Sequence, residues 1–168
     1  MTLVHKFGGT SVGSAERFCA VADILARYHG PEAGPDIGDT TAVVVVSAMS
    51  GVTNALLSGA WAAAEGRTEV THQAKAELLA RHLAVVDALF DATDEGGRLR
   101  AHIEGRLSQL ERLYDSIAVL GELTARGRDH VAAFGETLSV EILAACLRVR
   151  GLASDAVLAS DLIVTDDH

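Results

Sequence analysis

The amino-acid sequence predicts an α/β fold in which a parallel sheet is sandwiched by helices. Apolar residues make up 49% of the 168-residue chain but aromatic residues only 4%. Such an aliphatic, alanine-rich composition suits layered helices and parallel strands better than a β-sandwich. The chain also begins in the order strand, glycine loop, helix and strand, which is typical of a βαβ unit with a right-handed crossover.

This βαβ unit can be followed along the chain. Residues 3–7 form a short apolar segment that stops at Gly8 and Gly9, as a strand entering a tight loop does. Ser14 is placed to cap the next helix, in which apolar residues recur on one face: Phe18, Val21, Ala22, Leu25 and Tyr28. Glycines and prolines at positions 30–38 predict a surface loop. The next strand, residues 41–47, contains four consecutive valines and is predicted to be buried on both faces.

The central part of the chain is predicted to be helical. One apolar stripe consists of Leu56, Leu57, Ala60, Trp61 and Ala64, and we expect Trp61 to lie in the core. Further helices are predicted over residues 70–90 and 99–120. Because Gly96 and Gly97 separate these two helices, we expect a helical hairpin within an insertion of about residues 60–125.

The last part of the chain is predicted to extend the sheet. A short helix leads to Phe134 and Gly135, and another runs from Glu136 to Arg150, with Gly151 as its C-cap. Residues 153–158 are expected to form a third strand. Three strands leave a parallel sheet with an open edge, so we expect a fragment that pairs with further copies as a homo-oligomer.

Composition excludes some classes of function. The formal net charge is −9, so no nucleic-acid or anionic-membrane partner is expected, since both need clustered cations. The start of the chain lacks a secretory apolar stretch, and the longest aliphatic block has the length of a strand. We therefore expect a soluble, cytoplasmic protein. Cys19 and Cys146 are predicted to be buried, reduced thiols, and the scattered histidines predict no metal site.

The first candidate site is the glycine loop after the first strand: Lys6, Phe7, Gly8, Gly9, Thr10, Ser11 and Val12. Adjacent glycines let the backbone approach a ligand and direct N–H groups at it, and the dipole of the following helix favours an anion. Lys6 adds a mobile charge suited to phosphate oxygens. These features predict a phosphate cradle, although Walker loops place lysine after the glycines. The alternative is a strand-to-helix turn with a surface lysine.

The second candidate site directly follows the valine strand and comprises Ser47, Ala48, Met49, Ser50, Gly51, Val52, Thr53 and Asn54. Ligands of parallel sheets bind beyond the carboxyl ends of the strands, where both loops are expected to lie. Ser47 and Thr53 carry hydroxyl groups that can hydrogen-bond to a carboxylate. The alternative is that Ser50 and Thr53 only cap a helix.

The third candidate site is the segment Phe134, Gly135, Glu136, Thr137, Leu138 and Ser139. Glu136 can bind an ammonium group, or it can be an acidic residue that stabilises a first helical turn. Arg126 and Arg128 are near it in the sequence and are expected at the surface.

Together these three segments resemble the aspartate kinase branch of the amino-acid kinase family. Its chains open with a lysine-Phe-Gly-Gly-Thr-Ser segment, followed by a serine-alanine-x-x-Gly-x-Thr-Asn loop and a Gly-Glu-x-x-Ser segment. All three occur here in that order, and the closing Thr165, Asp166, Asp167 and His168 are similar to a later segment of the family. The resemblance covers the whole chain and implies the N-terminal lobe of a catalytic domain of the amino-acid kinase fold.

The resemblance also implies roles for single residues. Lys6 would neutralise charge on the transferred phosphoryl group, and the ATP phosphates would be lined by Gly8, Gly9, Thr10 and Ser11. Ser47 and Thr53 would contact L-aspartate, and Glu136 would pair with its amino group. The reaction would be transfer of the γ-phosphate of ATP, bound with Mg²⁺, to the side-chain carboxylate of aspartate. The product, 4-phospho-L-aspartate, opens lysine, threonine and methionine synthesis in this family.

The sequence also departs from the family. A later glycine-arginine-glycine-glycine-serine-aspartate loop, the adenine-binding strands and the regulatory domains have no counterpart in these 168 residues. We therefore expect this chain alone to be inactive. One alternative is a non-catalytic binding or assembly module of the same fold. The presence of Lys6, Thr53 and Glu136 favours the enzyme over this module. Another is a sister kinase acting on a different carboxylate or carbamate, which the loop at Ser47 disfavours.

Overall fold

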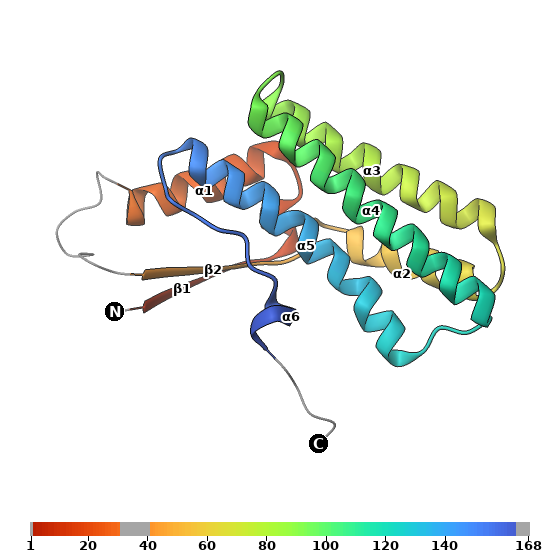
Figure 1. Cartoon of the computed structure of the whole chain (residues 1–168). Coiled ribbons are helices and arrows are strands. Elements are labelled where there is room, and N and C mark those ends of the chain that lie inside the picture. Colours follow the sequence, from red (N-terminus) through yellow and green to blue (C-terminus); the bar gives the residue numbers. More distant parts are fainter. Residues whose placement is uncertain (1, 31–40, 164–168) are drawn as a thin grey trace.

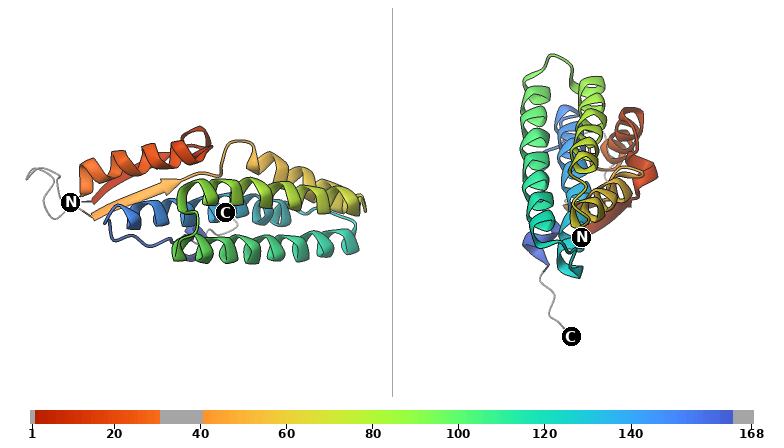
Figure 2. Two further views of the ribbon diagram at one scale, coloured as in Figure 1. Left: turned by 90° about the horizontal axis from the view of Figure 1, so that it is seen from above. Right: turned by 90° about the vertical axis from the view of Figure 1, so that its right-hand side faces the viewer.

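The computed structural model describes residues 2–30 and 41–163. Its elements, in chain order, are β1 (Thr2–Phe7), the 3₁₀ turn η1 (Gly9–Val12), α1 (Ala15–His29), β2 (Thr41–Val46), α2 (Val52–Ala64), α3 (Thr68–Phe90), α4 (Asp94–Leu120), α5 (Ala125–Val149) and α6 (Ala159–Leu162). Helices α2 to α5 run side by side as a bundle, and the strands and α1 lie at one end of it (Figures 1 and 2). The predicted loop at positions 31–38 and the segment from Thr165 to His168 fall outside the described residues.

The two strands form a parallel pair, as the βαβ pattern predicted. Thr2 lies opposite Thr41 and Phe7 opposite Val46. One face of this pair is covered by helices, since the His5 ring contacts Tyr28 and His29 of α1 and the side chain of Val46 is buried.

The other face of the sheet is open in the described part of the chain. Val4 is 61% exposed, Val43 44% and Val45 45%. The expectation of a sheet sandwiched by helices, with a second strand buried on both faces, is therefore wrong for these residues. The physical reason is that α1 and α5 lie on the same face of the sheet, where Leu25, Val44 and Leu143 line one hollow, while the other helices pack mainly on one another.

Helix α1 follows the predicted pattern closely. The Ser14 hydroxyl accepts a hydrogen bond from the amide of Arg17 at 3.4 Å, which makes it the predicted N-cap. Four of the five residues expected on the inner face are buried, while Tyr28 is 49% exposed because it lies in the last turn beside His5. Cys19 and Cys146 are free thiols, as predicted, although Cys19 is only half-buried.

Helices α3 and α4 form the predicted hairpin, but the chain turns at residues 91–93 and not at Gly96 and Gly97. The Thr93 hydroxyl accepts from the Gly96 amide at 3.1 Å and begins α4 there. A Cβ at Gly96 would lie 2.2 Å from the carbonyl oxygen of Phe90, so this glycine permits a close approach at the turn. The apolar face of α4 is fully buried at Leu99, Ile103, Leu107 and Leu110.

Helix α5 is a single helix of 25 residues, so the predicted break at Gly135 is wrong. A Cβ at Gly135 would lie only 2.5 Å from the Cβ of Ala48, and the glycine thus serves close packing within a continuous helix. By length and composition α5 could cross a membrane, but most of its apolar window is buried in the core. Trp61, expected in the core, is instead 52% exposed on α2.

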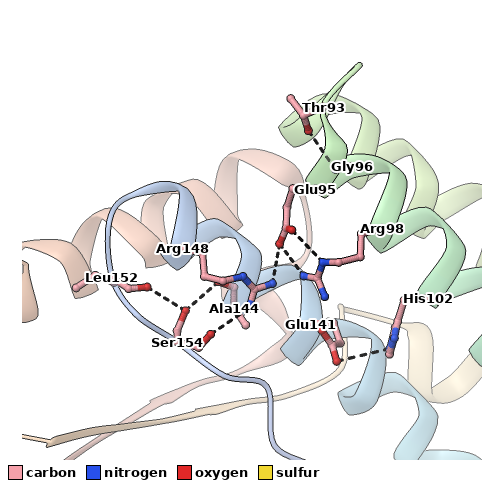
Figure 3. Close-up of polar contacts among 10 residues, drawn as sticks. All are labelled: Thr93, Glu95, Gly96, Arg98, His102, Glu141, Ala144, Arg148, Leu152 and Ser154. Carbon is pink, nitrogen blue, oxygen red and sulfur yellow. Dashed lines mark hydrogen bonds and ion pairs between the residues drawn. The ribbon is translucent and has the colours of Figure 1, made fainter.

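Residues 152–158 form no strand, which corrects the prediction of a third one. The segment is tied to α5: the Ser154 hydroxyl donates to the Ala144 carbonyl oxygen at 3.0 Å, and Arg148 donates to the Ser154 carbonyl at 3.0 Å (Figure 3). An open hollow of about 220 Å³ lies between this segment, β2 and α5. Without a third strand, the expected pairing of copies at its edge loses its basis.

The same Arg148 joins three parts of the fold through Glu95. The Glu95 carboxylate, in the first turn of α4, accepts from Arg148 of α5 at 2.6 Å and from Arg98 at 2.7 Å (Figure 3). These bonds, that of Arg98 foremost, lower the pKa of Glu95 to about 2 from its ordinary value of 4.5, against the opposing effect of burial. The clamp of Glu95, Arg98 and Arg148 therefore holds the hairpin, α5 and the segment after it together.

The clamp predicts an acid-dependent loss of stability. A carboxylate whose folded-state pKa is depressed stabilises the fold above its unfolded pKa, and that contribution disappears as the pH falls toward the folded value. We expect Glu95→Gln to lower the free energy of unfolding by roughly 1–3 kcal/mol at pH 7. In urea titrations at a series of pH values, the difference from wild type should shrink between about pH 5 and pH 2. A difference that stays constant over this range would contradict the clamp.

Candidate functional site

The first two candidate loops lie side by side at the carboxyl ends of β1 and β2. The Ser47 amide donates to the Phe7 carbonyl oxygen at 3.1 Å, which extends the pairing of the strands by one residue. Beyond it, the Ser50 amide donates to the Gly9 carbonyl oxygen at 3.2 Å. The glycine loop and the serine loop are thus joined by backbone hydrogen bonds.

Ala48 is the residue at which all three candidate segments meet. It is 3% exposed, and its amide donates to Glu136 Oε1 at 3.3 Å. A Cβ at Gly9 would lie 2.7 Å from the Ala48 carbonyl oxygen, and one at Gly135 would lie 2.5 Å from its Cβ. Both positions need glycine because no side chain fits between these segments. The structure therefore brings together the three segments that the sequence singled out.

The ammonium group of Lys6 lies beside the glycine loop. The Lys6 side chain is exposed, and a Cβ at Gly8 would lie 3.8 Å from the Lys6 Nζ, so the ammonium group is close to this part of the backbone. The Ser11 amide donates to the Gly8 carbonyl at 2.9 Å and closes the first turn of η1. The amides of Gly9 and Thr10 precede that bond and need partners from outside the turn. A cation and two such amides suit the oxygens of a phosphate group.

The start of α1 contributes less to anion binding than the sequence predicted. The Ser14 hydroxyl donates to Glu16 Oε2 at 2.7 Å, and this hydrogen bond lowers the pKa of the Glu16 carboxyl group. The chain therefore places its own negative charge at the positive end of the helix. This charge opposes the binding of a further anion at the start of α1, whereas Lys6 and the loop amides favour one at the glycine loop.

A capping role does not account for the hydroxyl groups of the second loop. The N-cap of α2 is Gly51, which has a left-handed conformation with φ of 81° and makes no side-chain cap bond. Thr53 is the second residue of α2 and is half-buried, as is Ser47 at the end of the strand pairing. The alternative in which Ser50 and Thr53 cap the helix is therefore wrong.

Glu136 lies in the middle of α5 and not in a first helical turn, which removes the alternative given for it. The side chain is half-buried, and one carboxylate oxygen accepts the Ala48 amide. A carboxylate has room for several more donors, so Glu136 can support the loop and still accept from an ammonium group.

One contact of this site was not found from the sequence. Arg81 of α3 donates from Nη2 to the carbonyl oxygen of Ser50 at 2.6 Å. The two residues are 31 positions apart, and the helical pattern around Arg81 predicts only an exposed cation on a long helix. No spacing rule links such a residue to a distant loop.

The glycine loop with Lys6, the serine loop and Glu136 thus lie together beyond the carboxyl ends of two parallel strands. The sequence pattern of the amino acid kinase family matches residues 1–167, and the chain belongs to this family. It is similar to aspartokinase 1 of Arabidopsis thaliana chloroplasts, with 35% identity over 99% of this chain and 27% of that protein. Aspartokinase 3 of the same plant is 36% identical and is covered over 28% of its length.

The fold is also similar to that of solved aspartokinases. The structure of E. coli aspartokinase III in complex with aspartate and ADP matches 90% of this chain and 29% of its own, with a TM-score of 0.70 and 25% identity. The complex of the same enzyme with lysine and aspartate matches with a TM-score of 0.69. The chain thus spans less than a third of the relatives it matches.

The close contact at Ala48 predicts opposite effects for two glycine substitutions. Gly135→Ala should lower the free energy of unfolding by about 1–3 kcal/mol, because the new methyl group would overlap with Ala48. Gly105→Ala is the matched control, since Gly105 also lies inside a helix but has nothing within 4 Å of an added Cβ. It should raise the stability by up to about 1 kcal/mol through helix propensity. Equal effects in urea denaturation would contradict the packing described for Gly135.

Proposed function

We propose that this chain provides the phosphate loop and part of the aspartate site of an aspartate kinase. The enzyme transfers the γ-phosphate of ATP to the side-chain carboxylate of L-aspartate. The observation that carries the proposal is the meeting of the glycine loop, the serine loop and Glu136 around Ala48, with Lys6 over Gly8. Membership of the amino acid kinase family, which uses ATP, supports it.

The nucleotide phosphates are proposed to lie at the glycine loop. The backbone at Gly8, Gly9, Thr10 and Ser11 lines this position, and the Lys6 ammonium group neutralises charge on the transferred group. Mg²⁺, bound to the phosphates, would supply further neutralisation and would arrive with the nucleotide. Such transfer depends mainly on positioning and on charge stabilisation, which fixed amides and a nearby cation provide.

Aspartate is proposed to lie beside the serine loop, within reach of Ser47, Thr53 and Glu136. The hydroxyl groups of Ser47 and Thr53 donate to a substrate carboxylate. The lone pairs of the Glu136 carboxylate that the Ala48 amide does not use accept from the substrate ammonium group. Glu136 and the Ser47 loop are joined through Ala48, so the groups that hold the two ends of the substrate are fixed relative to each other.

In the proposed reaction, an oxygen of the aspartate side-chain carboxylate attacks the γ-phosphorus. A new bond forms between this oxygen and phosphorus, and the bond from the γ-phosphorus to its bridging oxygen breaks. The electron pair leaves with ADP, and the product is an acyl phosphate, 4-phospho-L-aspartate. No covalent enzyme intermediate is needed, and the step would open lysine, threonine and methionine synthesis.

Substitution of Lys6 tests the phosphoryl-transfer role. In the complete gene product that contains residues 1–168, we expect Lys6→Ala to lower kcat by about 100-fold or more, with a smaller change in KM. Lys75→Ala, at the other lysine of the chain, should leave kcat unchanged because Lys75 pairs with Glu111 in the hairpin. A near-normal kcat for Lys6→Ala in a coupled ADP-release assay would remove Lys6 from the mechanism.

Two substitutions of Glu136 separate substrate binding from support of the loop. Glu136→Gln keeps an oxygen that can accept the Ala48 amide but removes the charge. If Glu136 pairs with the ammonium group, this variant should raise KM for aspartate by the equivalent of roughly 2–5 kcal/mol and leave KM for ATP almost unchanged. Thr53→Val should act in the same direction by a smaller factor.

Glu136→Ala removes both functions and should also lower the melting temperature. If Glu136 only supports the loop, Glu136→Gln will behave like wild type in steady-state kinetics while Glu136→Ala is impaired. That result would argue against ammonium binding by this residue.

A further inference from the structure

A side chain of the helical hairpin, that of Arg81, reaches the loop of the proposed aspartate site. Arg81 lies in α3, between Leu78 and Val85, which are both buried and fix this turn of the helix against the core. Its neighbour His82 is fully buried, and its Nδ1 donates to the Leu78 carbonyl oxygen at 2.7 Å. The backbone from which Arg81 extends is therefore firmly held, while the Arg81 side chain itself is exposed.

The guanidinium group of Arg81 holds a single peptide of the serine loop. Nη2 donates to the Ser50 carbonyl oxygen at 2.6 Å, and a Cβ at Gly51 would lie 3.7 Å from Nη1. On the other side, the Ser50 amide donates to Gly9. Ser50 is thus held by the glycine loop through its amide and by the hairpin through its carbonyl group.

The conformation of this loop makes such support useful. Gly51 has φ of 81°, and glycine has the widest choice of backbone conformations. A loop with this residue at its end can rearrange readily unless neighbouring groups hold it. Ser47 precedes the held peptide and Thr53 follows it, so a shift of Ser50 and Gly51 would move the two hydroxyl groups relative to each other.

Arg81 differs from Arg98 and Arg100 of the hairpin. Arg98 pairs with Glu95 and Arg100 with Asp87. Among the ion pairs of residues 2–30 and 41–163, Arg81 has no carboxylate partner. Its bond to a carbonyl oxygen leaves the positive charge uncompensated beside a loop that we propose binds a dicarboxylate, and a nearby positive charge favours such a ligand.

We infer that Arg81 is a positioning residue for the aspartate site. It fixes the segment from Ser47 to Thr53 through the Ser50 carbonyl group, so the hairpin determines how well the loop hydroxyls are placed for the substrate. The inference rests on the proposed function, because it assigns to this loop a role in binding aspartate.

The test compares three variants in the complete gene product. Arg81→Met removes the donor and keeps the length of the side chain, Arg81→Lys keeps a charged donor, and Arg100→Met removes an arginine of the hairpin that pairs with Asp87. Arg81→Met should raise KM for aspartate about 5- to 30-fold, as expected for loss of a charge-assisted hydrogen bond, and change KM for ATP less than about 2-fold. Arg81→Lys should recover part of the loss, and Arg100→Met should match wild type.

Hydrogen exchange provides a readout that does not depend on activity. Amides of residues 47–53 should exchange faster in Arg81→Met than in wild type or Arg100→Met, while α5 should be unchanged. An aspartate KM like that of Arg100→Met, or an equal rise in both KM values, would overturn the inference, as would unchanged exchange in the loop.

Failure of the proposed function gives a different pattern. If the wild-type protein does not phosphorylate aspartate, the proposed function is wrong and the role of Arg81 in binding aspartate falls with it. Faster exchange of the loop in Arg81→Met would then still show that the hairpin holds the loop.

Discussion

The arrangement of this chain depends on the contact of Ala48 with two glycines. Gly9 approaches its carbonyl oxygen and Gly135 approaches its methyl group, each so closely that a Cβ could not be accommodated without a shift. These contacts set the distance from the strand ends to α5. They also place Glu136, one position after Gly135, within reach of the Ala48 amide. A larger residue at any of the three positions would separate the loops and displace the carboxylate from the serine loop.

Local features of the fold could be predicted from the sequence, whereas the roles of glycines could not. The strands, the Ser14 cap and the hairpin follow from periodicity and capping, which depend on neighbouring residues. Gly96 and Gly135 were expected to interrupt helices because glycine has low helix propensity. Both lie inside helices. Gly96 makes room for the Phe90 carbonyl group at the turn between α3 and α4, and Gly135 makes room for Ala48 of a distant loop, which only the three-dimensional structure shows. The prediction of a third strand was wrong for a similar reason. Residues 153–158 have side chains that suit a strand, but Ser154 hydrogen-bonds to α5.

The candidate site also has features that the sequence predicted and one contact that it did not. Its three segments were identified from residue types and order, and the structure brings them together, although the roles of Lys6, Ser47, Thr53 and Glu136 stay predictions. Arg81 was missed because its contact joins an exposed helical position to a backbone carbonyl group. Sequence carries little information about such contacts, since any long donor at that position would fit the helical pattern equally well.

The residues of the site are far apart in the sequence, and this separation also affects the order in which the site forms during folding. Ala48 and Glu136 are 88 residues apart, and the α3–α4 hairpin lies between them. Contacts within a helical hairpin are local and form quickly, whereas contacts of high sequence separation form late because a large loop must close first. During synthesis the serine loop would thus leave the ribosome well before its carboxylate. The hairpin would already be folded when α5 docks, so the contact of Ala48 with Glu136 would form only after the hairpin.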